Sequence, residues 1–512
     1  MINNLNLLTM RPAGALTFCI CLLVAGCGGD SNQPSDGQPR STLDHALRAE
    51  IELHQLTGDP SLGRNLPSIE DPKAQLGMQL FYTKALSGDL DTACVTCHHP
   101  MLGGGDALSL SIGVDAESPD ILGMGRVHST SGEHYDGGPS VPRNAPTTFN
   151  LALWDKVLFH DGRVESLSGT PGMNGADGSG IRTPDVAFAE ADPEAGTNLS
   201  VAQARFPVTS PEEMKNFGWF EGISNQEVRQ YLQERLGDYG LPPGGPLAVN
   251  HWPALFAEVY GTPGTAAEDV VTFANIADAL AAYENSQVFV DTPWKKYVQG
   301  DEQALTAAQK RGALLFYRSI EQGGANCAGC HGGDFFTDEQ FHNTAMLQVG
   351  RGKGDGDNGT EDFGRYRETG QEKDRYAFRT PSLINVAATG PWGHAGAYTS
   401  LEGIVRQQLH PEQMFYHYDW SQLDPTVQTH FAQDNTQRAL DHWLTQLETG
   451  ESQLQPVSLN DTQVADLVAF MHALTDPCVL DRACMSPWIP DEYSESPDDL
   501  RLDGMDEYGN YW

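Results

Sequence analysis

Two short segments of the chain carry cysteine and histidine at the spacing that attaches haem. Their members are Cys94, Cys97 and His98 in the first segment and Cys327, Cys330 and His331 in the second. Two thiols three residues apart can each add to one vinyl group of a haem, and the next histidine can then ligate the iron. A structural zinc site needs four ligands, and a thioredoxin-like dithiol does not require the histidine. The repeated signature therefore predicts two covalently attached haem c groups.

The remaining cysteines have other expected roles. Of the nine cysteines, four belong to the haem signatures and three lie within the first 27 residues. Cys478 and Cys484 are left, and in an oxidising compartment we predict that they form a disulfide that closes the last helix onto the tail. The tail over 478–512 is acidic, and we expect it to be disordered or draped over the surface.

The first 26 residues have the features of an export signal. Arg11 precedes an apolar run over 13–25 that is too short for a membrane-spanning helix. The residues up to Cys27 match the bacterial lipobox, which implies cleavage before Cys27 and acylation of its thiol. A plain secretory signal is the alternative. We expect a protein of the periplasm, outer membrane or cell surface, with membrane contact only through this lipid.

Charge is the strongest compositional feature. The 512 residues include 69 acidic and 31 basic side chains, which gives a formal net charge of −38. Such a surface repels nucleic acid and attracts cationic partners, although a need for solubility explains it equally well. The 54 glycines and 31 prolines predict long irregular connections between short helices.

An internal duplication extends beyond the haem signatures. Residues 77–82 match 312–317, each at the end of an expected helix shortly before the cysteines. Residues 143–167 parallel 379–401, and seven residues separate the histidine from the final leucine in both copies (160 to 167 and 394 to 401). The predicted fold is mainly α, with two tandem cytochrome c-like haem domains and long Gly/Pro-rich loops.

This duplication sets the predicted domain boundaries. An amphipathic pattern over 268–289 and a capping box from Thr306 to Gln309 lie on either side of the expected domain junction. The predicted parts are a signal at 1–26, a polar tether and extension at 27–69, haem domains at 70–297 and 298–477, and the tail at 478–512.

Over about residues 70–480 the chain resembles the bacterial di-haem cytochrome c peroxidases and the related enzyme that matures methylamine dehydrogenase. The resemblance implies a cytochrome-c peroxidase-type oxidoreductase that reduces hydrogen peroxide with electrons from a cytochrome c or small copper protein. It also implies that the domain at 70–297 is peroxidatic and that the domain at 298–477 transfers electrons. The motifs that carry it beyond the haem signatures are 80–82 with 85–87, 143–147, 161–163, and 203–207 running to 211–214.

The resemblance assigns a catalytic role to Glu213. In the family, a glutamate just before a methionine lies over the open face of the N-terminal haem, and Glu213 occupies that position. A carboxylate shielded from water can move a proton from the inner to the outer oxygen of a bound peroxide. Gln203 and Pro207 align with residues that shape the same pocket. Without the family, an ordinary surface glutamate would be the simpler interpretation.

The family also binds calcium between its domains. Asn144, Thr389 and Pro391 match the residues that supply its oxygen ligands, and such an ion could fix the separation of the two haems. The competing interpretation is that Asn144 is a plain turn residue.

The chain departs from the family pattern at three places. His160 occupies the position where relatives place a tryptophan between the haems, so an electron-hopping route would need another side chain, such as Trp154. Gln408 stands seven residues after Leu401 and is a poor iron ligand. At this position the peroxidases supply a methionine to the second iron, and the maturation enzyme supplies a tyrosine. His410 or Met414 could replace Gln408. The loop before Arg143 is longer and holds His128 and His134, either of which could cap the first haem, or simply be solvated.

Three functions remain open at this stage. The first is the peroxidase. The second is an enzyme that oxidises tryptophan or tyrosine residues of a partner protein, for which the unusual residue Gln408 is the argument. The third is a non-catalytic electron carrier. The expected partners are hydrogen peroxide and an electron-donor protein or a protein substrate, with no nucleic acid, and a homodimer is left open.

Overall fold

The computed structural model describes residues 41–132, 135–218, 220–262, 264–491 and 493–512. The predicted signal, Cys27, residues 28–40 of the predicted tether and His134 lie outside these residues. Among the described residues, none of the helices combines the length and apolar composition needed to cross a membrane. Thr42–Trp512 forms one compact unit by its contacts, and the boundary near 298 stays a prediction.

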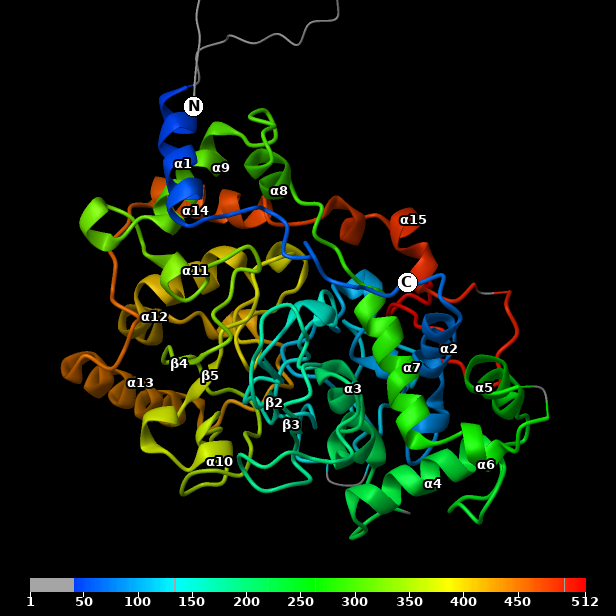
Figure 1. Cartoon of the computed structure of the whole chain (residues 1–512). Coiled ribbons are helices and arrows are strands. Elements are labelled where there is room, and N and C mark those ends of the chain that lie inside the picture. The colour runs from blue at the N-terminus through cyan, green and yellow to red at the C-terminus, as the bar shows by residue number, and fades with distance from the viewer. Residues whose placement is uncertain (1–40, 133–134, 219, 263, 492) are drawn as a thin grey trace, which may run out of the picture. The chain divides into compact units, whose positions relative to one another are not determined.

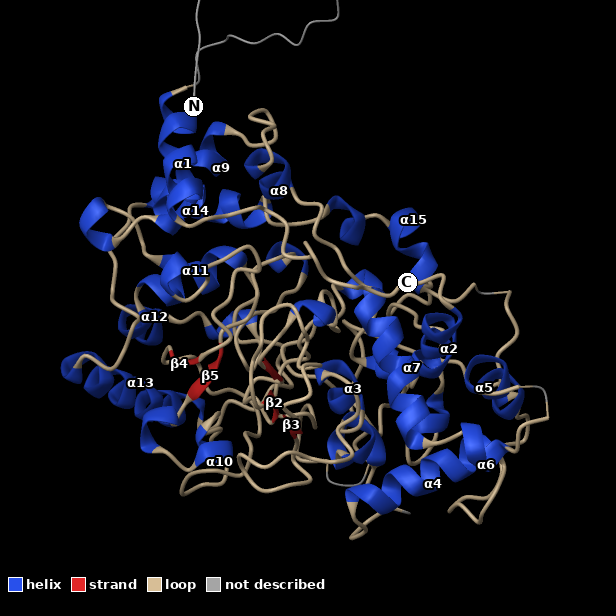
Figure 2. Cartoon of the chain, viewed as in Figure 1, coloured by secondary structure: helices blue, strands red, loops and turns tan. Residues whose placement is uncertain are grey.

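The predicted mainly α class with long loops is confirmed (Figure 2). Most helices are short because glycine and proline interrupt the chain frequently. The helices up to residue 298 are α1 (Thr42–Leu53), α2 (Pro72–Tyr82), α3 (Leu199–Ala204), α4 (Asn225–Gly237), α5 (Trp252–Tyr260), α6 (Ala267–Val270), α7 (Phe273–Ser286) and α8 (Pro293–Val298). The later ones are α9 (Ala307–Tyr317), α10 (Tyr366–Thr369), α11 (Leu401–Leu409), α12 (Pro411–His417), α13 (Ala432–Thr449), α14 (Asp461–His472) and α15 (Arg482–Met485).

Two helix pairs repeat the same crossing. Helix α2 packs on α7, and α9 packs on α14 (Figure 1). A Cβ atom on Gly77 of α2 would lie 1.9 Å from the carbonyl oxygen of Ala279, and one on Gly312 of α9 would lie 1.9 Å from that of Asp466. Only glycine lets the helix backbones approach this closely. The two segments that match in sequence therefore make the same helix–helix contact in the structure.

Each helix pair is the centre of a hydrophobic core. The first core gathers side chains of α2, α4, α5 and α7, including Phe81 against Tyr283 at a centroid distance of 4.9 Å. The second core gathers α8, α9 and α14, with Trp294 and Phe470 5.1 Å apart. Helix α1, from the predicted N-terminal extension, also belongs to the second core, where Leu47 is fully buried.

The few strands form two small antiparallel sheets. They position the motif at 161–163 in the turn between two strands, and they bring Arg379 into the second sheet opposite Phe341. The strands are β1 (Val157–Leu158), β2 (Val164–Ser166) and β3 (Ile181–Arg182) in one sheet and β4 (Phe341–Asn343) and β5 (Ala377–Arg379) in the other.

Of the two expectations for the tail, disorder is wrong, whereas draping over the surface describes it better, because many of its side chains are exposed and a few are buried. Cys478 and Cys484 form a disulfide, and the chain after α15 runs back along the first core (Figure 1). Leu502 is fully buried, and its N–H donates to the carbonyl of Tyr82 at 2.8 Å. Asp498 is buried as well and accepts from the indole of Trp252 at 2.8 Å. Apolar residues spaced among the acidic ones thus anchor a segment whose overall composition suggested disorder.

Candidate active site

The histidines of the two signatures have matching environments. The Nδ1 atom of His98 lies 3.1 Å from the carbonyl oxygen of Gly104, and that of His331 lies 3.0 Å from the carbonyl oxygen of Phe336. A backbone acceptor at Nδ1 fixes the proton there and leaves Nε2 free for a metal. Burial lowers the pKa of both rings, which favours the neutral, ligating form. Both sites fit an axial histidine of a haem iron.

The thiols also fit covalent haem. Cys94, Cys97, Cys327 and Cys330 are not in disulfides, although Cys478 and Cys484 are. Pro146 and Pro381, which lie in the two matched segments of the duplication, have the same neighbour in both halves, because their carbonyls are within hydrogen-bonding reach of His98 and His331.

A second observation supports a haem in the second half. Arg379 has a buried Nε atom without a hydrogen-bond partner among the described residues. Its guanidinium lies over the ring of Trp154, 3.6 Å from the centroid, and its Nη1 donates to the carbonyl of Val157. Glu339 and Asp161 act on Arg379 through their charge, but no direct ion pair of Arg379 is found among the described residues. A guanidinium with a free buried donor suits an anionic group of a cofactor, such as a haem propionate.

The signatures differ in their exposure to solvent. Val95 and Thr96, between the cysteines of the first signature, are fully buried. In the second signature Gly329 is exposed, and so is Asn326 just before the first cysteine. Haem attached at the second signature would therefore have an edge nearer to the surface.

Glu213 lies in a tight π-helical turn over Pro211–Lys215. The side chain is half-buried, and burial raises its pKa, while the positive charges of Arg163 and Lys353 act in the opposite direction. Glu213 is also close enough to Cys97 to raise the pKa of that thiol, which puts it on the side of the first haem signature. A raised pKa makes a carboxyl better suited to accept and return a proton.

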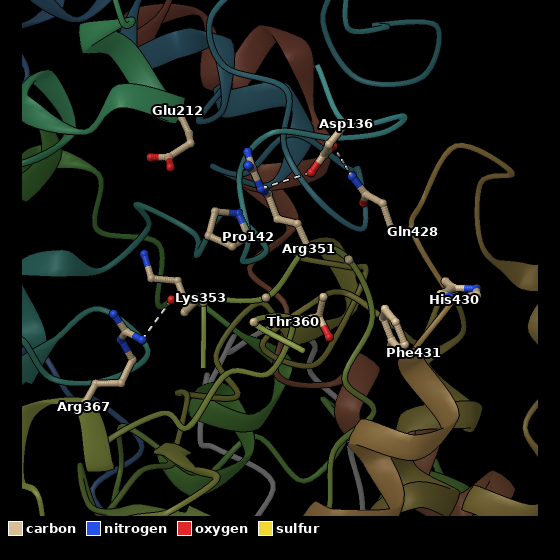
Figure 3. A pocket seen from close by; sticks show the side chains of 14 residues that line it. Asp136, Pro142, Glu212, Arg351, Lys353, Thr360, Arg367, Gln428, His430 and Phe431 are labelled. Carbon is tan, nitrogen blue, oxygen red and sulfur yellow. Dashed lines mark hydrogen bonds and ion pairs between the residues drawn. The ribbon is translucent and has the colours of Figure 1, made fainter. Parts of the chain in front are cut away.

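A cavity of about 560 Å³ lies next to this turn. Arg351 and Lys353 border it from the glycine-rich segment 350–354, and Glu212, the neighbour of Glu213, borders it from another segment (Figure 3). No ion pair or hydrogen bond of the Lys353 amino group is found among the described residues, and burial lowers its pKa. The cavity gives water and small solutes a route towards Glu213.

Gln203 lies at the end of α3, and Pro207 begins the next turn. The Gln203 Oε1 atom is buried without a hydrogen-bond partner among the described residues. This free acceptor is consistent with the predicted pocket role, which stays a prediction.

His160 lies where the two halves meet. Its Nε2 is 3.0 Å from the carbonyl oxygen of Asn144, and its own carbonyl accepts from the N–H of Arg379 at 2.8 Å. Burial lowers the pKa of His160 to about 3, so the ring is neutral at physiological pH. Trp154 packs edge-on against Phe335, four residues beyond His331, with centroids 5.2 Å apart. Trp154 thus contacts a residue that follows the second haem signature closely in the chain.

A buried ion network explains two motifs whose role the sequence left open. Arg143 donates to Asp161 at 2.5 Å, and through Nε and Nη2 to Asp362 at 2.6 and 2.8 Å. The guanidinium holds the pKa of both carboxyls well below the usual range. Sequence reasoning missed Asp362, because nothing in its local context signals a partner 219 residues away.

The predicted calcium ligands lie together in part. Asn144 and Thr389 line one small cleft, which Asp106 also lines, while Pro391 follows through a cis Gly390–Pro391 bond. Burial raises the pKa of Asp106 to about 6. Carboxylate and amide oxygens suit Ca²⁺, so the donor set fits, and Asp106 is a candidate that sequence reasoning missed.

The candidates for the second distal ligand occupy different environments. Gln407 is buried and accepts from the Tyr398 hydroxyl at 2.6 Å, whereas Gln408 is half-buried. His410 joins α11 and α12 with its Nε2 3.4 Å from the Ser458 hydroxyl, and Met414 packs on a cluster separate from the core that contains Cys327. The assignment of His410 or Met414 stays a prediction.

His128 is buried in its loop. Its Nδ1 lies 3.0 Å from the carbonyl oxygen of Ser129, and its ring contacts Tyr135 at 5.4 Å. These contacts give it a structural role in the long loop.

Comparisons with known proteins agree on one family. Residues 71–303 match the family model described as di-haem cytochrome c peroxidase. The methylamine utilization protein MauG of Methylorubrum extorquens is 27% identical over 75% of this chain and 79% of its own. The cytochrome c peroxidase Ccp of Escherichia coli is 29% identical over 66% of this chain, but only 53% of that protein is covered. A solved MauG-like protein associated with microbial copper homeostasis covers 84% of this chain and 97% of its own, with a TM-score of 0.51 at 21% identity.

Proposed function

We propose that this chain, whose residues 71–303 match the di-haem cytochrome c peroxidase family model, reduces hydrogen peroxide to water with electrons from an external protein donor. When bound, the two haems supply the irons that bind peroxide and pass electrons. Cys94, Cys97 and His98 would hold the first haem, and Cys327, Cys330 and His331 the second.

Glu213 supplies the proton chemistry of the proposed reaction. Its carboxylate accepts the proton of the inner peroxide oxygen and returns it to the outer oxygen, which then leaves as water. Two electrons and two further protons complete the reduction to two waters. The observation that carries this proposal is the half-buried Glu213, whose raised pKa suits a relay and whose turn borders a cavity of about 560 Å³.

Replacement of Glu213 by glutamine tests the relay. The amide keeps the shape but cannot take up the proton, so we expect Glu213→Gln to slow peroxide consumption by about 100-fold or more with both haems still attached. The matched control is Glu212→Gln, which changes the neighbouring carboxylate at the cavity and should keep most of the rate. Unchanged peroxide consumption in Glu213→Gln would refute the relay.

The exposed second signature supports electron uptake there. Gly329 and Asn326 are open to solvent, and Ile320 nearby is 37% exposed, so a donor could approach that haem edge closely. The net charge of −38 favours a basic cytochrome c or copper protein as donor.

A second function is supported by the residues at the expected distal position. The hydrogen bonds of Gln407 hold this stretch of α11 in place, and neither Gln407 nor Gln408 is the methionine of the peroxidases. A different second iron site favours oxidation of tryptophan or tyrosine residues in a partner protein. Slow turnover with donors, together with a modified aromatic residue in partner peptides by mass spectrometry, would select this function. A ferric spectrum that does not respond to stoichiometric peroxide would leave only electron carriage.

Calcium binding is also part of the proposal. An ion bound by Asn144, Thr389 and Asp106 would connect the loop before the motif at 143–147 to the second half. Chelation of calcium should lower the thermal unfolding midpoint and the rate of peroxide reduction, and added Ca²⁺ should restore both.

We further propose export to the periplasm or cell surface with a lipid on Cys27. The lipobox-like residues before Cys27 support it. Fatty-acid labelling that persists in Cys27→Ser would exclude this anchor.

A further inference from the structure

We propose that Arg126 and Arg235 are positioning residues for Glu213, which hold its turn from two sides through the backbone loops that enclose it. The inference rests on the proposed relay role of Glu213. It assigns to two buried arginines a function that no family motif gives them.

Arg126 forms hydrogen bonds to four backbone carbonyls. Nε donates to Ile112 at 2.6 Å, Nη2 to Gly113 at 2.8 Å, and Nη1 to Pro119 and Ile121 at 2.9 and 3.0 Å. The residue is only 4% exposed. Burial of a cation is costly, and carbonyl dipoles offset that cost only if the loop keeps its shape. Arg126 therefore fixes the path of residues 112–121.

The loop held by Arg126 lies directly against the turn of Glu213. A Cβ atom on Gly113 would lie 2.3 Å from the carbonyl oxygen of Glu212 and 2.5 Å from that of Glu213. The backbone of Gly113 does not adopt a positive φ, so the turn, and not the local conformation, excludes a side chain there. The N–H of Val114 also donates to the Glu212 carbonyl at 3.4 Å.

Arg235, on α4, binds the backbone carbonyls of a second loop, which lies against the other side of the turn. Its Nη1 donates to the carbonyls of Ala85 and Ser87 at 3.0 and 2.6 Å, and its Nη2 donates to that of Gly88 at 3.2 Å. The N–H of Gly88 donates in turn to the carbonyl of Met214 at 2.8 Å. A Cβ atom on Gly88 would lie 1.8 Å from the Lys215 carbonyl oxygen. Residues 85–88 and 112–114 thus enclose the turn over Pro211–Lys215.

The loops around the turn matter because the turn is too short to hold its own shape firmly, and a proton relay depends on the position of the Glu213 carboxylate. A displacement of about 1 Å at a catalytic group can cost on the order of 100-fold in rate. Guanidinium groups suit this task, because a rigid planar fork of five donors can bind several carbonyls in fixed directions, whereas an ammonium offers three donors on a flexible stem. Lysine is accordingly not a conservative replacement at either position.

Hydrogen exchange of the holoprotein gives a readout that does not depend on turnover. We expect Arg126→Gln and Arg235→Gln to speed amide exchange in a peptide over 207–217, where the N–H groups of Lys215 and Asn216 close the turn. The matched control is Arg48→Gln, because Arg48 also donates to two backbone carbonyls, Tyr297 at 2.6 Å and Val298 at 2.8 Å, but in the second core. Exchange over 207–217 that is no faster in the two variants than in the control would overturn the proposal.

A double-mutant cycle links the arginines to the reaction. Each arginine variant alone should slow peroxide consumption about 10- to 100-fold with both haems attached, and Arg48→Gln should not. In a Glu213→Gln background the same changes should cost little more, because the group they position is already gone. Fully additive losses would overturn the proposal.

The two proposals fail in different ways. A full rate in Glu213→Gln alone removes the relay, whereas the exchange data still report on the enclosure. If the arginine variants do not fold, Gly113→Ala provides the second route, since it keeps both arginines and its methyl group must displace the turn. Unchanged exchange and rate in Gly113→Ala would then overturn the inference.

Discussion

The two haem signatures are supported by equivalent helix pairs, but they differ in how far the surrounding chain shields them from solvent. Each follows a helix whose glycine, Gly77 or Gly312, packs on the backbone of a later helix, and each histidine donates from Nδ1 to a carbonyl. The first signature has buried residues between its cysteines, and the second has Gly329 open to solvent. The duplicated halves thus support the two signatures in the same way and cover them differently. Under the proposed function, the buried signature would serve the shielded chemistry and the exposed one the exchange of electrons with partners.

The strongest test of this division removes one haem at a time. Replacing Cys94 and Cys97 by serine, or Cys327 and Cys330, should halve the pyridine haemochrome absorbance and abolish donor-driven peroxide reduction in both cases. The variant without the first haem should still accept electrons from a reduced donor, because the exposed site is intact. Full turnover after loss of the second haem would show that electrons do not need it.

The tail is the next element to test. Leu502 is fully buried against the first core, so Leu502→Ala should lower the free energy of unfolding by about 2–5 kcal/mol. Hydrogen exchange should rise around residues 93–98 and stay unchanged around 326–331. Equal effects on both signatures would break the comparison.

A buried acid distinguishes the cores. Glu284 in α7 and Met471 in α14 occupy equivalent positions in the two cores. Each lies five residues after the residue that contacts the helix glycine, Ala279 in α7 and Asp466 in α14. Burial raises the pKa of Glu284 from 4.5 to about 8. Between these values the unfolded chain releases a proton that the folded protein keeps, so stability falls as pH rises, by up to about 1.4 kcal/mol per pH unit.

Glu284→Met, which copies the second core, should remove this pH dependence. Urea unfolding of the holoprotein at pH 5 and pH 8 measures it, and Glu268→Gln, in the exposed part of α6, is the control. A slope that persists in Glu284→Met would assign it to other groups.

The smallest expected effect concerns the donor. If the second haem edge receives electrons from a basic protein, raising the ionic strength from about 10 mM to 0.5 M should slow turnover about tenfold, because the attraction is screened. An uncharged small-molecule reductant is the control and should show no such loss. Turnover that is insensitive to salt would argue against an acidic docking surface.

Motifs with fixed local chemistry could be predicted from the sequence. The spacing of the haem signatures, the mainly helical fold and the family resemblance depend on contiguous residues, and the comparisons confirm them. The sequence shows that Gly77 and Gly312 occupy equivalent positions of the repeat. Only the structure shows why glycine is needed there, because each lies where two helix backbones approach closely.

Contacts between distant residues could not be predicted in the same way. Arg143 and Asp362 are 219 residues apart, and the carbonyls bound by Arg235 are 147 or more residues from it. The tail looked disordered because an average over acidic residues hides a few anchoring positions such as Leu502. A single sequence carries no signal for these pairings, since each side chain is ordinary in its own neighbourhood.

The ends of the chain are exchanged between the halves, since α1 completes the second core and residues 498–512 complete the first. The first core is therefore complete only when the last residues of the chain have been synthesised. Because those residues pack against the helix that precedes Cys94 and Cys97, cofactor attachment can precede the final packing of this half.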